Sequence, residues 1–470
     1  MRTLISNKIY ISDPTPEIAA YCREKLIIAN PDYEKRRRMG KWLGGTPQRL
    51  VLYERDGDTL ALPFGCLREL LPLIGSGEIE CDFPDYRRVD YHCNVPLFDY
   101  QEPAVDELVR QKFGILESPA GSGKTQMGVA LIARLGCKTL WLTHTADLLK
   151  QSMERAAMYM DPALFGTITA GKVDIGEGVT FATVQTLAAQ DLSRFRYAFD
   201  AVIVDECHHL SGTPTMLRQF SAVVGALACR HKYGLTATLH RADKLERTVC
   251  DYLGAVAYSV PASAVDGRIM SVTVQEHPTG IDIGDECLDT DGTIIYSRLV
   301  SYLAGSAARN RLIADDLAAN AGHYNLILSD RVEHLRTLCD MLPEDIRPLA
   351  AVIDGKMQSK RAKAERGAVI EDMRQGRRRY LFATYKLAKE GLDIPRLDRL
   401  YLTTPQKDYA TVVQAVGRVA RTFADKQPPV CYDYVDDADY FRGAFRVRCR
   451  HYKKCGCKIE RSEQRPASEK

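Results

Sequence analysis

Short apolar runs alternate with longer amphipathic stretches over most of the chain after residue 94. The runs of the first half are rich in β-branched residues and have the length of buried strands; they lie at 113–116, 138–143, 179–184, 200–205 and 233–238. A second series lies at 325–329, 349–354, 379–384, 399–404 and 430–435. Buried strands that alternate with helices indicate βαβ units and a parallel sheet. The pattern therefore predicts two α/β domains in tandem, at residues 95–261 and 262–436.

Residues 1–94 follow a different pattern, for which we predict a small α+β module. Two strand-like runs, 50–55 and 59–62, flank the dipeptide Asp56-Gly57. This dipeptide accepts positive φ values and favours a hairpin between the two runs.

Two further segments are basic or irregular. Lys35 to Arg38 and Lys41 precede Trp42, which fits either a nucleic-acid grip through charge and stacking or an aromatic residue that fills a local core. Residues 268–309 begin with an alternating run, and they predict an entry strand followed by a hairpin or loop insertion that belongs to the second domain.

The last segment, 437–470, predicts a basic helical tail without a strand. It contains Tyr452 and a set of basic residues, which favour a helix that guides a nucleic-acid strand: Arg442, Arg446, Arg448, Arg450, Lys453, Lys454 and Lys458. A zinc site at Cys455 and Cys457 is the less favoured alternative, because this spacing has no matching second pair.

The composition narrows the class of protein. The 470 residues are 45% hydrophobic and 27% charged, which is ordinary for globular domains, and the net charge of +3 is only mildly basic. The 14 cysteines include no CxxC pair, and the N-terminus has no apolar core of signal-peptide type. No run approaches the length of a membrane span. We therefore expect that the thiols are reduced, that the protein does not associate with a membrane, and that it is located in the cytoplasm of a bacterial or phage-infected cell.

A glycine-rich segment follows the run 113–116 and precedes a helical stretch that stops at Gly136. Glycines in this setting let backbone N–H groups wrap phosphates at a helix N-terminus. We expect Lys124 to reach the β- and γ-phosphates of a nucleotide and the hydroxyl of Thr125 to bind Mg²⁺. The nucleotide-contacting candidates of this loop are Ser118, Pro119, Ala120, Gly121, Ser122, Gly123, Lys124 and Thr125.

Two carboxylates stand at the end of the apolar run 201–204, where α/β proteins place residues that contact ligands. Asp205 can hold Mg²⁺ directly or through water, and Glu206 can orient and polarise an attacking water. An acidic pair at a strand end is commonly a helix cap, but the phosphate loop upstream favours catalysis.

With these motifs the chain resembles the superfamily 2 helicases, because Asp205-Glu206-Cys207-His208 matches their DExH box. Segments similar to the later motifs follow in the family's order, with motif Ia at 142–151, motif III at 234–238, motif V at 383–395 and motif VI at 414–421. The resemblance covers about 98–435. Residues 236–243 are similar to the DNA-repair and phage-recombination branch, the UvsW and XPB type, although Leu239 stands where proline is usual.

The resemblance implies two RecA-like P-loop domains that hydrolyse ATP with Mg²⁺ between them. Arg418 and Arg421 are three residues apart and would share one face of a helix. The resemblance implies that this face points at the terminal phosphate of ATP. It implies a role in catalysis for Gln414 and a role in ATP binding for Gln101, Gly391 and Asp393. It also implies that His208, Thr236 and Thr238 couple ATP hydrolysis to movement.

The resemblance also implies a nucleic-acid track along both domains, gripped by hydroxyls and backbone N–H groups. Its candidate residues are Thr143, Thr145, Thr169, Gly171, Thr183, Gln185 and Arg241 in the first domain and Ser329, Arg331, Thr384 and Lys386 in the second. Single-stranded or branched duplex DNA is the expected partner, and RNA is less favoured. An RNA helicase and a DNA-binding switch that does not unwind remain the alternatives. No nuclease motif is present, so DNA cutting would need a protein partner such as a nuclease or a replication or repair factor.

Overall fold

The computed structural model describes residues 1–461 apart from 41, 120, 209–213, 238, 240–245, 266–268, 355–359, 390–391 and 407. The chain forms two compact units. One unit holds Met1–Ser118 and Gly123–Val260, and the other holds Pro119–Ser122 and the chain from Pro261 onward. No described helix is long and apolar enough to cross a membrane.

The N-terminal module is built on a five-stranded sheet in the order β5-β6-β2-β1-β7, with β1 and β7 parallel and the other pairs antiparallel. Its core joins Ile11 and Leu62 of the sheet to Ile18 of α1 and Leu70 of α3. The elements are β1 Arg2–Ile5, β2 Ile9–Ser12, α1 Pro16–Lys25, β3 Ile27–Ala29, α2 Pro31–Arg38, β4 Arg49–Val51, β5 Glu54–Asp56, β6 Thr59–Leu62, α3 Leu67–Ile74 and β7 Glu78–Cys81.

The expected hairpin exists in shorter form. Gly57 adopts a φ of +56° and joins β5 to β6. The first predicted run is not one strand, however, because it divides between β5 and β4, and β4 pairs with β3 in a separate two-stranded sheet.

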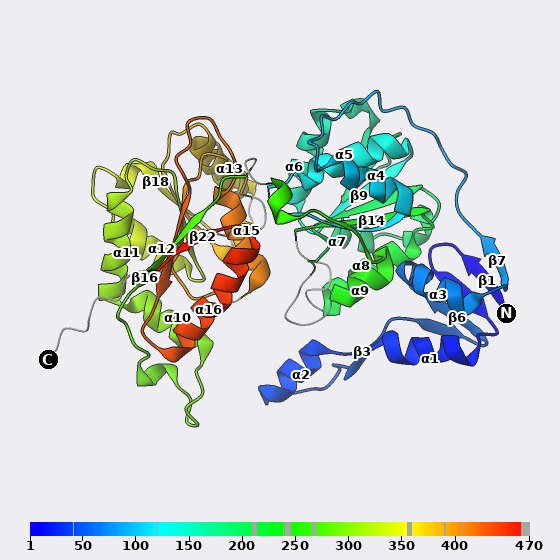
Figure 1. Ribbon diagram of the computed structural model, residues 1–470, viewed down its shortest axis with the longest axis horizontal. Coiled ribbons are helices and arrows are strands. Elements are labelled where there is room, and N and C mark those ends of the chain that lie inside the picture. Colours follow the sequence, from blue (N-terminus) through cyan, green and yellow to red (C-terminus); the bar gives the residue numbers. More distant parts are fainter. Residues whose placement is uncertain are drawn as a thin grey trace. The chain divides into compact units, whose positions relative to one another are not determined.

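The module packs against the first α/β domain inside the same unit (Figure 1). The buried Lys232 ammonium donates hydrogen bonds to the backbone carbonyls of Asn7 at 3.0 Å, Val224 at 3.0 Å and Leu227 at 2.9 Å. The ring of Phe64 covers the same ammonium at 4.7 Å. An ammonium has three N–H donors, so each one is satisfied, and the hydrogen bond to Asn7 together with the Phe64 ring joins the module to the domain.

The first α/β domain has an eight-stranded sheet in the order β11-β10-β12-β9-β13-β14-β8-β15, in which the β10–β11 pair alone is antiparallel among the described strands. One face of the sheet packs on α7, α8 and α9 through Leu142, Val204 and Phe220. The other carries α4, α5 and α6 (Figure 1). The elements are α4 Glu102–Gln111, β8 Phe113–Glu117, α5 Lys124–Leu135, β9 Thr139–Thr143, α6 Ala146–Ala157, β10 Phe165–Thr169, β11 Lys172–Asp174, β12 Val179–Thr183, α7 Val184–Ala188, β13 Ala201–Asp205, α8 Pro214–Ala226, β14 His231–Thr236, α9 Glu246–Leu253 and β15 Val256–Ser259.

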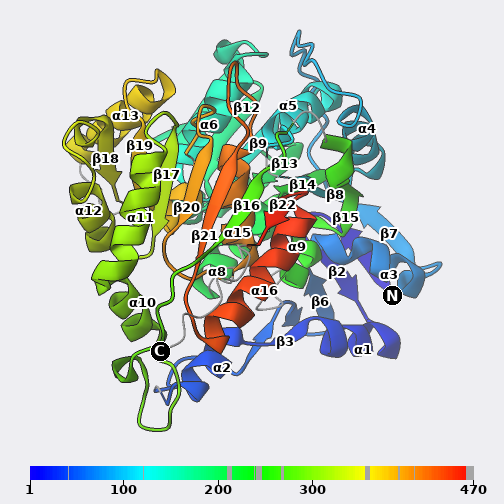
Figure 2. The ribbon, with the colours of Figure 1, turned by 60° about the vertical axis from the view of Figure 1, so that its left-hand side comes forward.

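The second α/β domain has a seven-stranded parallel sheet in the order β18-β19-β17-β20-β21-β16-β22 (Figure 2). Successive strand residues point to opposite faces. Leu326 and Leu328 therefore face the core that α13, α14, α15 and α16 cover, whereas Ile327 faces α11 and α12. The elements are β16 Thr273–Pro278, α10 Tyr296–Gly305, α11 Ala307–Ala319, β17 Asn325–Ser329, α12 Val332–Asp340, β18 Ala350–Ile353, α13 Lys360–Arg374, β19 Tyr380–Thr384, α14 Tyr385–Lys389, β20 Arg399–Leu402, α15 Tyr409–Val419, β21 Val430–Val435, α16 Asp439–Lys454 and β22 Lys458–Glu460.

The C-terminal segment is helical as predicted, but the prediction that it lacks a strand is wrong. Residues after α16 form β22, which pairs in parallel with β16 at the edge of the sheet. Arg448 of α16 is buried and makes a two-pronged ion pair with Asp433 of β21. Arg448 therefore cannot guide a nucleic-acid strand, because its charge is used inside the domain.

The segment 268–309 contains the expected entry strand, β16, and the expected turn. Leu288 and Ile294 form an isolated antiparallel bridge around Gly292, whose φ is +77°.

Candidate active site

The glycine-rich loop leads from β8 into α5 as the sequence predicts. Gly123 has a φ of +82° and stands at the N-cap of α5, where no side chain caps the helix. The first N–H groups of the helix have no partner within the helix, so they can receive phosphate oxygens. A Cβ at Gly123 would lie 2.5 Å from Nε2 of Gln101. The backbone conformation therefore favours glycine here, and a Cβ would in addition displace the Gln101 amide from the loop.

Gln101 lies against this loop. It is fully buried at the start of α4, and its Oε1 accepts a hydrogen bond from the Phe98 N–H at 2.9 Å. The ring of Phe98 stacks on Tyr100 with 5.9 Å between the centroids. Gln101, to which the resemblance gives a role in ATP binding, thus lies beside the phosphate loop.

Lys124 and the acidic pair meet at the carboxyl end of the sheet. Nζ of Lys124 donates to the Ser118 carbonyl at 3.5 Å and lies 3.7 Å from Oε1 of Glu206. Glu206 has a φ of +48°, a left-handed conformation that is uncommon for a residue with a side chain. Such conformations cluster at functional sites, where the surrounding structure holds them.

Asp205 ends β13 and is almost fully buried. Its Oδ1 accepts from the Glu206 N–H at 3.0 Å, and its Oδ2 accepts from the hydroxyl of Ser152 on α6 at 3.4 Å. Burial and the neighbouring Glu206 raise the pKa of Asp205 to about 7, although Lys124 opposes them. The sequence reasoning missed Ser152, since no local pattern shows that its position on α6 faces the end of β13.

These residues fit ATP with Mg²⁺. Thr125 and Asp205 supply the oxygen ligands that Mg²⁺ prefers, and a divalent cation would stabilise the ionised form of the Asp205 carboxyl. Lys124 and the helix N-terminus supply the positive charge that phosphates need. When bound, Mg²⁺ would neutralise part of the phosphate charge.

The acidic pair is linked to the next strand. Nδ1 of His208 lies 3.4 Å from Oε2 of Glu206 and 2.8 Å from the hydroxyl of Thr236, the last residue of β14. A polar chain thus runs from Lys124 through Glu206 and His208 to Thr236. Thr238 and Arg241 lie outside the described residues, as do Ala120 and Gly391.

The two candidate arginines of the second unit converge on one segment. Arg418 donates to the carbonyls of Ala388 at 3.0 Å and Leu392 at 3.1 Å, and Arg421 pairs with the Asp393 carboxylate. The expectation that both lie on a helix is wrong for Arg421, because α15 ends at Val419. Gln414 lies inside α15 and is buried.

Several candidate nucleic-acid contacts of the first unit have local structural roles. Thr145 and Thr183 cap α6 and α7, with their hydroxyls accepting backbone N–H groups three residues ahead. Thr143 is buried and donates to the Thr145 carbonyl. Gly171 lies in the turn between β10 and β11, next to Thr169, and Gln185 lies on α7. Threonine, glycine and glutamine at such positions commonly serve as turn or helix-cap residues and not as ligand contacts.

The candidates of the second unit follow the same pattern. Ser329 is buried between the His334 ring at 3.0 Å and the Arg331 N–H at 3.1 Å. The hydroxyl of Thr384 accepts from the Leu387 N–H at 3.4 Å in the first turn of α14. Lys386 is exposed on this helix. The buried Ser329 thus holds the backbone N–H of Arg331 and is not exposed for a contact with nucleic acid.

The structure bears on two alternatives that the sequence left open, the role of Trp42 and a zinc site at Cys455 and Cys457. Trp42 is 80% exposed, so it does not fill a local core. No group of three or more His, Cys, Asp or Glu residues could hold a metal ion in the part of the chain that the structure describes. Cys455 and Cys457 therefore have no set of partners for zinc there.

Comparison with known families gives two consecutive matches. The family described as type III restriction enzyme, res subunit, matches residues 94–241, and the helicase conserved C-terminal domain matches residues 308–423. The first match contains the phosphate loop and the acidic pair, and the second contains Arg418 and Arg421.

Curated relatives are viral and cellular helicases. A protein of Acanthamoeba polyphaga mimivirus named as an ATP-dependent RNA helicase is 24% identical over 73% of this chain and 64% of its own length. A protein of Escherichia phage T5 named as a helicase is 24% identical over 68% and 67%. The DNA 3'-5' helicase XPB of Mycobacterium tuberculosis is 24% identical over 75% and 63%. The chain thus spans about two thirds of the length of these relatives.

Solved structures share the fold. The restriction-modification enzyme LlaBIII bound to DNA has a TM-score of 0.57 at 15% identity, over 80% of this chain and 32% of that one. Dbp5 of S. cerevisiae bound to RNA has a TM-score of 0.56 at 17% identity, over 78% and 89%. Both α/β domains are RecA-like, and with its two matched helicase domains the chain resembles the superfamily 2 helicases, in particular the phage and XPB-type members.

Proposed function

We propose that this chain is an ATP-dependent DNA helicase or translocase that remodels duplex or branched DNA. The observation that carries the proposal is the polar chain from Lys124 through Glu206 and His208 to Thr236. It connects the group that would bind the terminal phosphates to Thr236 at the end of β14, which lies within motif III.

In the proposed reaction, Glu206 orients and polarises a water for attack on the γ-phosphate, and Lys124 offsets the charge that develops there. Arg418 and Arg421 of the second domain are the groups that we propose stabilise the charge developing on the terminal phosphate. Arginines in this role typically accelerate hydrolysis by about 10³ to 10⁵. Because neither domain has all of these groups, nucleic acid that favours the competent arrangement would stimulate hydrolysis.

We propose DNA as the substrate because relatives named XPB are DNA 3'-5' helicases. RNA is the second candidate, since the mimivirus relative is named as an RNA helicase. The exposed Trp42 beside the Arg-rich helix α2 supports a role for the N-terminal module in nucleic-acid binding by stacking and charge. We also propose that the chain is organised as an N-terminal module at 1–94, two RecA-like domains at 95–261 and 262–436, and a C-terminal segment at 437–470. The C-terminal segment packs into the second domain.

The test is phosphate release by the full chain with single-stranded DNA, forked DNA, a Holliday junction and RNA side by side. We expect the greatest stimulation with forked or branched DNA. Lys124→Ala should reduce stimulated hydrolysis to background, whereas Lys25→Ala, which changes an exposed lysine of α1 outside the helicase motifs, should not. Stimulated phosphate release by the Lys124→Ala protein would refute the phosphate-site assignment. Stimulation by RNA alone would overturn the choice of DNA.

A further inference from the structure

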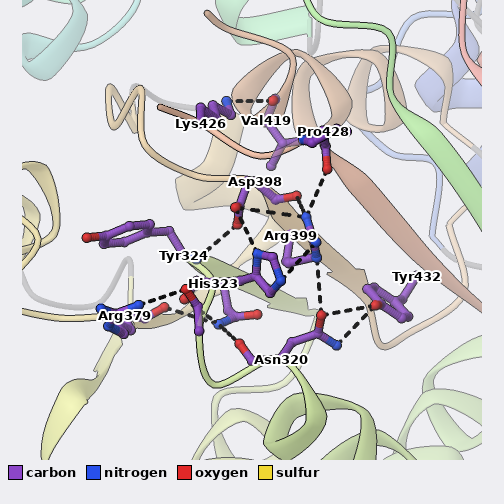
Figure 3. Close-up of polar contacts among 12 residues, drawn as sticks. Asn320, His323, Tyr324, Arg379, Asp398, Arg399, Val419, Lys426, Pro428 and Tyr432 are labelled. Carbon is purple, nitrogen blue, oxygen red and sulfur yellow. Dashed lines mark hydrogen bonds and ion pairs between the residues drawn. The ribbon is translucent and has the colours of Figure 1, made fainter. Parts of the chain in front are cut away.

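Lys426 lies in the loop between α15 and β21 and points back at the end of motif VI. Its Nζ donates hydrogen bonds to the backbone carbonyls of Val419 at 2.7 Å, Arg421 at 2.6 Å and Pro395 at 3.0 Å. Figure 3 shows its contact with Val419. The three acceptors match the three N–H donors of an ammonium.

The three carbonyls belong to the two segments that carry the candidate ATP residues of the second domain. Val419 is the last residue of α15, and carbonyls at a helix C-terminus have no partner within the helix. The second carbonyl is that of Arg421 itself. Pro395 ends the motif V segment, two residues after the Asp393 carboxylate that binds the Arg421 side chain. Lys426 therefore holds the backbone of Arg421 to the same segment that holds its guanidinium.

The loop that carries Lys426 is itself anchored. Asp425 has a φ of +58°, which turns the chain just before Lys426. Two residues after Lys426, the Pro428 carbonyl accepts a hydrogen bond from Nη1 of Arg399 at 3.0 Å, as Figure 3 shows. Arg399 begins β20, so the loop is fixed to the sheet on one side and to Arg421 on the other.

We propose that Lys426 is a positioning residue, which fixes the backbone of Arg421 so that its guanidinium can reach the terminal phosphate of ATP. This inference rests on the proposed function, in which Arg421 stabilises the charge that develops during hydrolysis. A misplacement of about 1 Å in such a group can reduce the rate by about 100-fold. The ammonium therefore acts on turnover through Arg421, without a contact to the nucleotide.

The charged groups that act on the ammonium make it sensitive to pH. Burial lowers the pKa of Lys426 to about 8, Asp398 opposes this shift, and the positive charge of Arg421 adds to it. Above that pH the group becomes a neutral amine, which has two N–H donors and a lone pair. At least one of the three carbonyls then loses its donor, and the Arg421 backbone loses part of its support.

The test uses the full chain with saturating forked DNA. We expect Lys426→Met to reduce kcat by about 10- to 100-fold and to leave the KM for ATP within about twofold, because a group that acts in the transition state alters kcat. Lys426→Arg keeps the charge and should recover part of kcat. The unchanged protein should lose activity above a pH of about 8, and Lys426→Arg should retain it there. Lys25→Met, the same change at an exposed lysine of α1, is the control and should leave kcat unchanged.

A double-mutant cycle separates this inference from the proposed function. If Arg421→Ala and Lys426→Met each reduce kcat and the double variant is no worse than Arg421→Ala, the two residues act as one unit. If Arg421→Ala reduces kcat but Lys426→Met behaves like Lys25→Met, or the losses multiply, the positioning role is overturned and the proposed function stands. Normal turnover by Arg421→Ala overturns both. Should Lys426→Met fail to fold, an unchanged alkaline loss in Lys426→Arg would overturn the positioning role.

Discussion

Breaking the ion pair between Arg448 and Asp433 should destabilise the second domain strongly. Nε and Nη2 of Arg448 bind the two carboxylate oxygens at 2.8 and 2.7 Å, and the Tyr452 hydroxyl binds the same carboxylate at 2.7 Å. The two charged side chains are 3% and 1% exposed, so water cannot replace a lost partner. Arg448→Met would leave a buried carboxylate without its cation, at a cost of about 3 to 5 kcal/mol.

In a domain of this size each kcal/mol lowers the melting temperature by about 2 to 4 °C, so the expected loss is about 6 to 20 °C. The measurement is thermal unfolding of the full chain, followed by circular dichroism. Arg450→Met, at an exposed position on the same helix, is the control and should melt like the unchanged protein. Adding Asp433→Leu to Arg448→Met should restore part of the loss, because it removes the unpaired charge. If Arg448→Met melts within about 1 °C of the control, α16 is not held by this pair.

Three other perturbations test the first unit. Lys232→Met removes the donor from three buried carbonyls and should cost at least about 3 kcal/mol; a denaturation midpoint equal to that of the unchanged protein would show that the module is held by other contacts. ATP hydrolysis should decrease on the acidic side, because burial and Glu206 raise the pKa of Asp205 and protonation of its carboxyl removes a ligand of Mg²⁺. A higher Mg²⁺ concentration should move this loss of activity to lower pH, since the cation competes with the proton for the carboxylate. A loss of activity whose pH does not depend on the Mg²⁺ concentration would contradict the assignment of Asp205 as a Mg²⁺ ligand. Gly123→Ala should abolish binding of an ATP analogue, because its Cβ would meet Gln101, whereas Gly280→Ala has a similar positive φ with nothing within 4 Å and serves as the control. Equal analogue binding by both variants would mean that the contact with Gln101 does not matter.

Strands that are buried on both faces were predictable from local pattern. The runs 325–329 and 430–435 coincide with β17 and β21, and the run 179–184 differs from β12 by one residue. The strands β10, β15 and β22, which lie at or near the edge of a sheet, were missed, although the edge strand β18 was predicted as the run 349–354. Such strands contain polar and exposed residues, so their apolar period is weak, and pairing with a neighbour decides their conformation.

The phosphate loop and the acidic pair were also readable from the sequence, since each is a contiguous segment whose chemistry depends on local backbone. The partners that hold these groups were not. Ser152 reaches Asp205 across 53 positions of the sequence, and Lys426 reaches the Pro395 carbonyl across 31, so only the tertiary structure brings these groups together.

The sequence by itself determined two α/β domains, the loop that can wrap phosphates and the order of the helicase motifs, because periodicity and short motifs are local properties of the chain. The tertiary structure alone decided which charges remain available for ligands. Arg448 was one basic residue among many in a predicted tail, and it proved to be paired with Asp433 inside the core. A charge is functional or structural according to the groups that surround it in space, and a linear pattern contains no record of those neighbours.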